Sequence, residues 1–401
     1  MTAQGPDSYS RRKFLQATAS VIGSAILPGA AGAGQKDNSL TLGYLPITDA
    51  APLLVAHGKG FFADEGLDVP DPVMVRSWNV LTESFLAGKF DLTHMLFPIP
   101  VWMRFRQNYP AKVLAWDHTN GSAVTVHGDS SIRGFADLGG KQIAVPSWYS
   151  MHNLILQLGI RKKGLTPVIR PQTSVLRDDE VNLFILPPPE MPPALLGKKI
   201  DGFIVAEPFN ALAEVRLKAR IMRFTGDIWK NHPCCVVVTH ERLINNRPAV
   251  IQKAMNALVR AQIWCTSNPD GAARLLSREG LGYLPVPWEV LHRVFMGYDL
   301  PEYLSGPLPR PVMHPGWKIS RIGFQPYPFP SATEFIISQM AKTLVDGDSA
   351  FLQTLDPNIA AKELVDDRFV REALKTVAGS DVFFPPDMAN HFIREEIIEI
   401  D

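Results

Sequence analysis

The sequence predicts an α/β fold of two lobes, in which each lobe is a mostly parallel sheet flanked by helices and two crossing strands join the lobes. Three observations support this prediction. The chain has 401 residues, which is more than one hydrophobic core normally organises. Short apolar strand patterns alternate with helical patterns, which is typical of parallel sheets with right-handed crossovers. A late strand pattern at residues 234–239 can carry the chain back into the first lobe.

The first lobe is predicted to contain residues 38–124 and 236–401. Asp49 is expected to cap a helix that begins at Ala50. Residues 306–321 are rich in proline and glycine, and we expect an irregular loop there. Short apolar runs bounded by turn residues predict strands at residues 39–45, 69–75, 92–96 and 112–116. Apolar residues on one face predict further helices at residues 80–87, 99–107, 248–267, 269–277, 331–344 and 359–378.

The second lobe is predicted to contain residues 125–235. A strand at residues 122–127 leads into it, near the point where the chain crosses between the lobes. An apolar stripe predicts a helix that begins near Met151, and Asn210 is a suitable N-cap for a helix at residues 210–220. Further strands are expected at residues 142–145, 183–186, 203–205 and 221–224.

Residues 1–34 carry the pattern of a twin-arginine signal peptide. Arg11 and Arg12 precede a mildly apolar run at residues 17–27. Small residues at 31–33 then have the form of a cleavage site. No cysteine lies near this site, so no lipid anchor is expected. We therefore expect a mature protein that is exported to the periplasm by the twin-arginine route.

Composition and motifs exclude several functional classes. Lysine and arginine total 40 residues, and aspartate and glutamate also total 40, so no basic excess supports nucleic-acid binding. The 3 cysteines do not make a disulfide framework, and CxxC, HExxH and phosphate-loop motifs do not occur. No pair of titratable residues has a spacing that requires acid–base catalysis. We therefore expect a binding protein rather than an enzyme, without a cofactor or a metal.

The candidate binding residues lie where predicted strands end. Loops at the carboxyl ends of parallel strands are the usual ligand positions in α/β folds. Two of these loops open directly into helices, whose free N–H groups suit a small anion. The polar, small or aromatic residues at these positions are Thr48, Asp49, Trp78, Asn79, Ser122, His152, Ala206 and Glu207, together with the start of the strand at Cys234.

Each candidate also has a structural interpretation. Trp78 can cover a helix N-terminus as part of the core. His152 can be a histidine whose hydrogen bonds are met within the protein. Glu207 can pair with an arginine across the cleft. His94, inside a strand, is a further candidate, and its alternative is a buried histidine bonded to its neighbours.

Several segments match a known family in order along nearly the whole mature chain. These segments resemble nitrate- and bicarbonate-binding proteins of ABC importers. The resemblance implies a periplasmic binding-protein-like fold of type II that closes on a small anion. It also implies a membrane permease and an ATPase as partners, and we expect a monomer. The matching segments are LGYLPITDAAPL at 42–53, GFF at 60–62, GLDV at 66–69, SWNV at 77–80, HML at 94–96, NG at 120–121, ILPPPEM at 185–191, DGFIVAEPFN at 201–210, WKNHP at 229–233 and FQPYPFPS at 324–331.

The resemblance implies that Trp78 and His152 contact the anion. Three positions depart from the family pattern. Ser122 replaces a glutamine, Ala206 replaces a glycine, and Cys235 stands where the family has a lysine. A neutral thiol in place of an ammonium removes the main counter-charge of an anion. The ligand class is therefore left open among nitrate, nitrite, cyanate, bicarbonate, sulfonates and related nitrogen or sulfur compounds.

The adjacent cysteines have several interpretations. Strand alternation predicts that Cys234 and Cys235 point to opposite faces, and the match to the lysine selects Cys235 as the one that faces the cleft. The alternatives are two small apolar strand residues, a strained disulfide, or a soft metal ion such as Cu(I) held by the pair.

For the whole protein, two further alternatives are a ligand-sensing subunit of a receptor system and a thiamine-pyrimidine-synthase-like enzyme.

Overall fold

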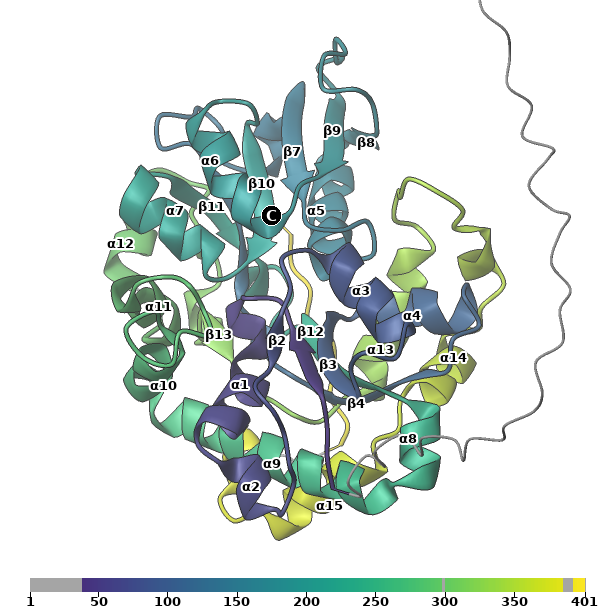
Figure 1. The fold of residues 1–401 in the computed structure, drawn as a ribbon. Coiled ribbons are helices and arrows are strands. Elements are labelled where there is room, and N and C mark those ends of the chain that lie inside the picture. Colours follow the sequence, from purple (N-terminus) through teal and green to yellow (C-terminus); the bar gives the residue numbers. More distant parts are fainter. Residues whose placement is uncertain (1–37, 298–299, 385–391, 401) are drawn as a thin grey trace, which may run out of the picture. The chain divides into compact units, whose positions relative to one another are not determined.

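The computed structural model describes residues 38–297, 300–384 and 392–400. This part of the chain is an α/β fold with two mixed sheets, each flanked by helices (Figure 1). The prediction of an α/β fold with two main sheets is therefore confirmed. The predicted signal peptide, residues 1–34, lies outside the described residues. No helix within the described ranges is both long enough and apolar enough to cross a membrane.

The first sheet has the strand order β2-β1-β3-β12-β4. Strand β1 pairs in parallel with β2 and β3, whereas β12 runs antiparallel to β3 and β4. All but the last residue of β12 are buried, as its apolar sequence CVVVTH predicts. The predicted return strand is thus confirmed as part of the first sheet. The strands are β1 (Leu42–Tyr44), β2 (Val73–Met74), β3 (Leu92–Leu96), β4 (Ala111–Trp116) and β12 (Cys235–His240).

Helices from both ends of the chain surround this sheet. The long helix α9 packs against α1, α2, α10 and α15. Figure 1 shows α1, α2, α9 and α15 gathered beside one another in the lower part of the view. The main helices of this group are α1 (Ala51–Gly58), α2 (Phe61–Asp64), α3 (Trp78–Leu86), α4 (Pro98–Phe105), α8 (Glu241–Asn246), α9 (Pro248–Ser267), α10 (Pro269–Leu276), α11 (Trp288–Phe295), α13 (Pro330–Met340), α14 (Pro357–Leu364) and α15 (Arg368–Thr376).

The second sheet has the strand order β11-β6-β10-β7-β9-β8. Strands β10, β7, β9 and β8 are parallel, and β6 runs antiparallel to both β10 and β11. Helices α5, α6 and α7 pack on this sheet (Figure 1). The elements are β6 (Ser122–Val126), β7 (Lys141–Val145), α5 (Met151–Lys162), β8 (Thr166–Val168), β9 (Glu180–Ile185), α6 (Met191–Leu196), β10 (Gly202–Ala206), α7 (Phe209–Leu217) and β11 (Arg220–Phe224).

Two chain crossings between the sheets lie side by side. Strand β5 (Thr119–Asn120) leaves the first sheet, and the segment around Pro233 returns to it. The N–H of Asn120 donates to the carbonyl oxygen of His232 over 2.9 Å. Strand β13 (Ile322–Gly323) pairs with β5 on its other side. The predicted lobe boundaries at residues 124–125 and 235–236 remain a prediction.

Two predicted helix caps are wrong, because both side chains are buried and have tertiary partners. Helix α1 begins at Ala51, and the Asp49 carboxylate contacts His118 instead of the helix. Asn210 lies inside the first turn of α7. Its amide accepts from the Thr125 hydroxyl over 2.8 Å and donates to the Val205 carbonyl over 2.7 Å.

Two element predictions also need correction. The strand predicted at residues 69–75 is only β2, whose two residues are exposed at the sheet edge. The single helix predicted at 359–378 is two helices, α14 and α15. Between them, Val365 forms a bridge to Val113 of β4, and the N–H of Asp366 donates to the Val113 carbonyl over 2.9 Å. The pairing with the edge of β4 interrupts the helix.

Candidate functional site

Strand directions bring one edge of each sheet to the candidate site. Because β1, β3 and β4 run the same way and β12 runs against them, their carboxyl ends share an edge with the start of β12. In the second sheet, the carboxyl ends of β7, β10 and β11 share an edge with the start of β6. Such edges are where α/β folds bind ligands.

Contacts between these two edges define what we call the junction. The N–H and the hydroxyl of Thr48 both donate to the carbonyl oxygen of Glu207, over 2.9 and 3.1 Å. The Cys234 sulfur lies 3.8 Å from the Ser122 hydroxyl and 4.0 Å from Nε2 of His152. Candidates predicted from separate strand ends are therefore brought together.

On the second-sheet side, Ser122 and His152 form a buried pair. The Ser122 hydroxyl and Nε2 of His152 are 2.9 Å apart, and both residues are almost fully buried. His152 is held in the first turn of α5, whose N-cap Ser150 accepts from the Asn153 N–H over 3.0 Å. Nδ1 of His152 has no hydrogen-bond partner among the described residues. Ala206 faces Ser122 across the β6–β10 ladder.

On the first-sheet side, Asp49, His118 and Cys235 form a fully buried group. Nε2 of His118 lies 2.8 Å from Oδ2 of Asp49, and the Cys235 thiol donates to the same oxygen over 3.1 Å. Burial raises the pKa of Asp49, and His118 partly offsets this. Burial alone would lower the pKa of His118, but the Asp49 carboxylate and its hydrogen bond raise it well above its usual range.

A glycine makes room for the His118 ring. Gly121 has a φ of 72°, in the region that favours glycine. A Cβ atom at this position would lie 2.9 Å from Cε1 of His118. The crossing strand therefore fits closely against the imidazole.

The prediction that the two cysteine side chains lie on opposite faces is wrong. Cys234 precedes β12, so strand alternation does not apply to it. Both sulfur atoms converge with the carboxyl of Asp49 and the ring of His118, and the four ligand atoms lie within 4.8 Å of one another. Both cysteines are free thiols, so the disulfide alternative is not what the structure shows. Cys234, rather than Cys235, is the cysteine beside Ser122 and His152.

Trp78 and His94 form a second buried group beside the first. Their rings meet edge to face with centroids 5.6 Å apart, and Trp78 is 3% exposed. Nε2 of His94 accepts from the Leu45 N–H over 3.0 Å. Burial lowers the pKa of His94 to about 3, so the ring is neutral at pH 7. The alternative of a buried histidine that is hydrogen-bonded within the protein therefore fits His94.

Asn79 lies apart from the junction and is exposed. It lines a groove of about 400 Å³ together with Trp78, Trp148 and Tyr149. Since Trp78 touches both this groove and His94, the groove reaches the outer side of the second buried group.

The Glu207 carboxylate is engaged by an arginine. Oε1 of Glu207 accepts from Nε of Arg321 over 2.8 Å, and Oε2 accepts from the Ala211 N–H over 2.9 Å. Arg321 also bonds Glu214 over 2.8 Å. The alternative of an arginine partner is therefore confirmed, and only the main chain of Glu207 reaches Thr48.

Sequence reasoning missed His118, His232 and Arg321. His118 follows the end of β4, so the strand-end rule that selected Ser122 could have found it. His232 bonds the Thr225 hydroxyl over 2.8 Å and faces the Pro233 carbonyl over 2.9 Å. Arg321 lies in a segment predicted as an irregular loop, and no local pattern marks it as a buried residue.

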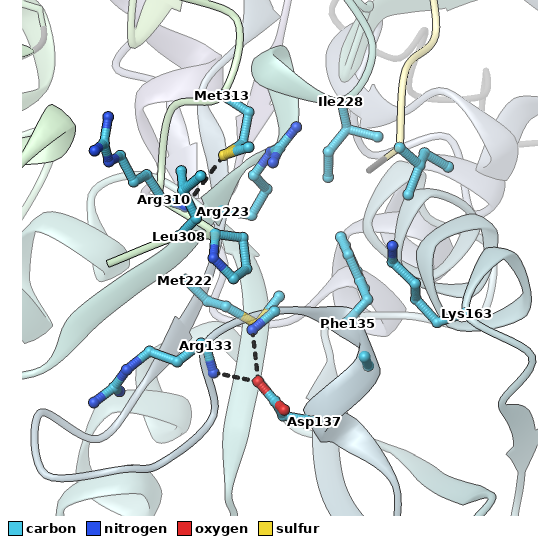
Figure 2. A pocket seen from close by; sticks show the side chains of 14 residues that line it. Arg133, Phe135, Asp137, Lys163, Met222, Arg223, Ile228, Leu308, Arg310 and Met313 are labelled. Atoms are coloured by element: carbon cyan, nitrogen blue, oxygen red, sulfur yellow. Dashed lines mark hydrogen bonds between the residues drawn. The ribbon is translucent and has the colours of Figure 1, made fainter. Parts of the chain in front are cut away.

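A separate cavity of about 330 Å³ contains none of the predicted site residues. Figure 2 shows Phe135, Met222 and Ile228 lining it, with the guanidinium groups of Arg133 and Arg310 directed away from Phe135 and Ile228. These groups donate to the main-chain oxygens of Ser130 and Gly306, respectively. Phe135, Met222 and Ile228 therefore give the cavity apolar walls, and Lys163 and Arg223 also line it.

Comparison with known proteins identifies the family. The profile of the NMT1-like family matches residues 33–278. The nitrate/nitrite binding protein NrtA of Nostoc sp. is 28% identical over 302 residues, covering 64% of this chain and 66% of that protein's length. The bicarbonate-binding protein CmpA of Synechococcus elongatus is 24% identical over 431 aligned residues, covering 94% of this chain and 90% of CmpA.

A solved structure agrees with the sequence comparison in its fold. The periplasmic nitrate-binding protein NrtA from Synechocystis PCC 6803 superposes with a TM-score of 0.69 at 20% identity, covering 87% of this chain and 91% of that one. The resemblance to nitrate- and bicarbonate-binding proteins and the periplasmic binding-protein fold, both expected from the sequence, are confirmed. This chain belongs to the NMT1-like family.

Proposed function

We propose that this protein is the solute-binding component of an ABC importer and that it binds a small solute at the junction. The observation that carries the proposal is the pair Ser122 and His152, which meets Cys234 from the opposite sheet edge at 3.8 and 4.0 Å. The relatives named for binding nitrate, nitrite and bicarbonate support a solute of similar size. When the two lobes close, a solute would contact these buried side chains between the two sheets.

The chemistry of the junction constrains the solute. The side chains at the junction and in the buried group beside it are those of Thr48, Asp49, His118, Ser122, His152, Cys234 and Cys235, and none of them is a lysine or an arginine. A strongly charged anion would therefore lack a fixed counter-charge there. Ser122 and His152 can donate hydrogen bonds to an oxyanion or to a cyanate-like or sulfonate-like group. We propose a weakly charged or hydrogen-bonded member of these classes.

We further propose that the mature protein works in the periplasm after twin-arginine export and delivers its solute to a membrane permease with its ATPase. A monomer is sufficient for this role, because the residues of the junction come from one chain. We propose binding rather than catalysis, since the relatives are named as binding proteins. A sensing subunit would use the same junction, and the identity of the docking partner distinguishes it.

A thermal-shift screen tests this proposal. The purified protein is melted alone and with nitrate, nitrite, bicarbonate, cyanate, taurine and alkanesulfonates. A solute present at about 100 times its Kd should stabilise the protein by about 2.7 kcal/mol. The shift should disappear in His152→Ala and persist in Arg310→Ala, which alters only the cavity of Figure 2. A screen without any shift, or a shift that His152→Ala leaves intact, contradicts the proposal.

A further inference from the structure

Four side chains at the junction are arranged as a set of metal ligands. Asp49, His118, Cys234 and Cys235 each offer one ligand atom, and these atoms all lie within 4.8 Å of one another. All four residues are fully buried. In a tetrahedral zinc site with metal–ligand distances of about 2.0–2.3 Å, neighbouring ligand atoms are roughly 3.3–3.8 Å apart. The separations of 2.8 and 3.1 Å from Oδ2 of Asp49 to His118 and Cys235 need only small adjustments.

The main chain holds the two cysteines in place. The N–H of Phe97 donates to the Cys234 carbonyl, and the N–H of Asp117 donates to the Cys235 carbonyl, each over 3.0 Å. Both donors follow strands of the first sheet, β3 and β4. The cysteines are therefore fixed by the sheet itself, which is the kind of rigid support that a metal site requires.

Buried polar atoms at this group lack partners. Oδ1 of Asp49 and Nδ1 of His118 have no hydrogen bond within the described chain. Leaving a buried polar atom unpaired costs about 1–3 kcal/mol, and more when the group is charged. The same group contains a carboxylate and two thiols but no lysine or arginine. A cation held by the carboxylate and the two sulfur atoms would compensate their negative charge once the thiols are deprotonated.

We propose that Asp49, His118, Cys234 and Cys235 form a thiolate-rich metal site that takes Zn(II) or Cu(I). Two sulfur ligands and one imidazole select borderline or soft metal ions over Mg²⁺ or Ca²⁺. On binding, sulfur–metal bonds replace the sulfur–hydrogen bonds of both thiols, whose protons are released to the solvent without change of oxidation state.

The test measures metal binding without any solute, so its outcome is independent of the proposed transport function. The mature protein is stripped with a chelator and titrated with Zn(II) against a chromophoric competitor, and in a second arm with Cu(I) under reducing conditions. One equivalent should bind in one of the two arms. Co(II) serves as a spectroscopic probe, because thiolate-to-cobalt charge-transfer bands report sulfur ligation directly.

Substitutions identify the ligands. Cys234→Ser and Cys235→Ser should each weaken binding by more than about 100-fold, since changes outside the ligand shell alone cost about 10–100-fold. Cys265→Ser is the matched control, because Cys265 is also a buried free thiol but lies outside the group. Asp49→Asn provides a further variant if a serine variant does not fold. Absence of stoichiometric binding in both arms, or equal binding by wild type and the ligand variants, overturns the proposal.

Discussion

Replacing Arg321 by methionine tests how the second-sheet edge is held. Arg321 is 1% exposed and Glu207 is fully buried. Their side chains are joined by bonds of 2.8 and 2.6 Å from Nε and Nη2 to Oε1. Removing one partner of a buried ion pair costs about 3–5 kcal/mol, because the other charge is left uncompensated. Glu214 is less affected by the loss of Arg321, because Arg293 and Tyr303 also donate hydrogen bonds to its carboxylate. We therefore expect Arg321→Met to lose about 3–5 kcal/mol of unfolding free energy.

Urea unfolding at pH 7 measures this loss. The double variant Arg321→Met with Glu207→Gln should recover part of it, because no carboxylate is then left unpaired at position 207. Arg177→Met is the matched control, since its pair with Asp179 is exposed and its loss should change the unfolding free energy far less than the loss of Arg321. Glu207→Gln alone should leave solute affinity unchanged. A loss below about 1 kcal/mol in Arg321→Met, or no recovery in the double variant, would show that the buried pair with Glu207 does not hold this edge of the sheet.

Three further predictions follow from the site and the signal peptide. Trp78→Ala should destabilise the solute-free protein by about 3–5 kcal/mol because the ring is buried. His152→Ala should instead weaken solute binding by about 1–3 kcal/mol. Calorimetry measures both effects, and the reverse pattern contradicts the assignment of Trp78 to the core and of His152 to the binding site. His94 has a folded-state pKa of about 3, below its usual 6.5, so the unfolded chain takes up the proton first. The stabilising effect of the neutral His94 ring is therefore present above pH 6.5 and is lost as the pH falls toward 3. His94→Gln should remove up to about 1.4 kcal/mol per pH unit from the slope of unfolding free energy in this window; an unchanged slope counts against a buried neutral ring. Changing Arg11 and Arg12 to lysine should retain the protein in the cytoplasm, and fractionation that still recovers it from the periplasm would disprove twin-arginine export.

The elements with strong local patterns were predictable from the sequence. Strand β12 is a run of buried residues, and its return to the first sheet follows from its position in the chain. The rule that ligands bind at strand ends selected Thr48, Ser122 and His152, which the structure brings to one junction. These predictions depend on strand direction, which the alternation of strands and helices reveals.

The remaining features depend on tertiary contacts that no local pattern encodes. Asp49 has the residue type of a helix cap, but burial beside His118 and Cys235 gives it a different role. The orientation of Cys234 could not be predicted, because the strand begins one residue later than expected. Arg321 lies more than 100 positions from Glu207 in the sequence, so their pairing becomes visible only in three dimensions.

A crystal structure of the protein with the solute selected by the thermal-shift screen tests whether a small solute binds between the two sheet edges at the junction. The solute should lie within hydrogen-bond distance of Ser122 and His152 and beside Cys234. A solute located instead in the groove lined by Trp148 and Tyr149, or in the cavity of Figure 2, would show that the junction is not the binding site.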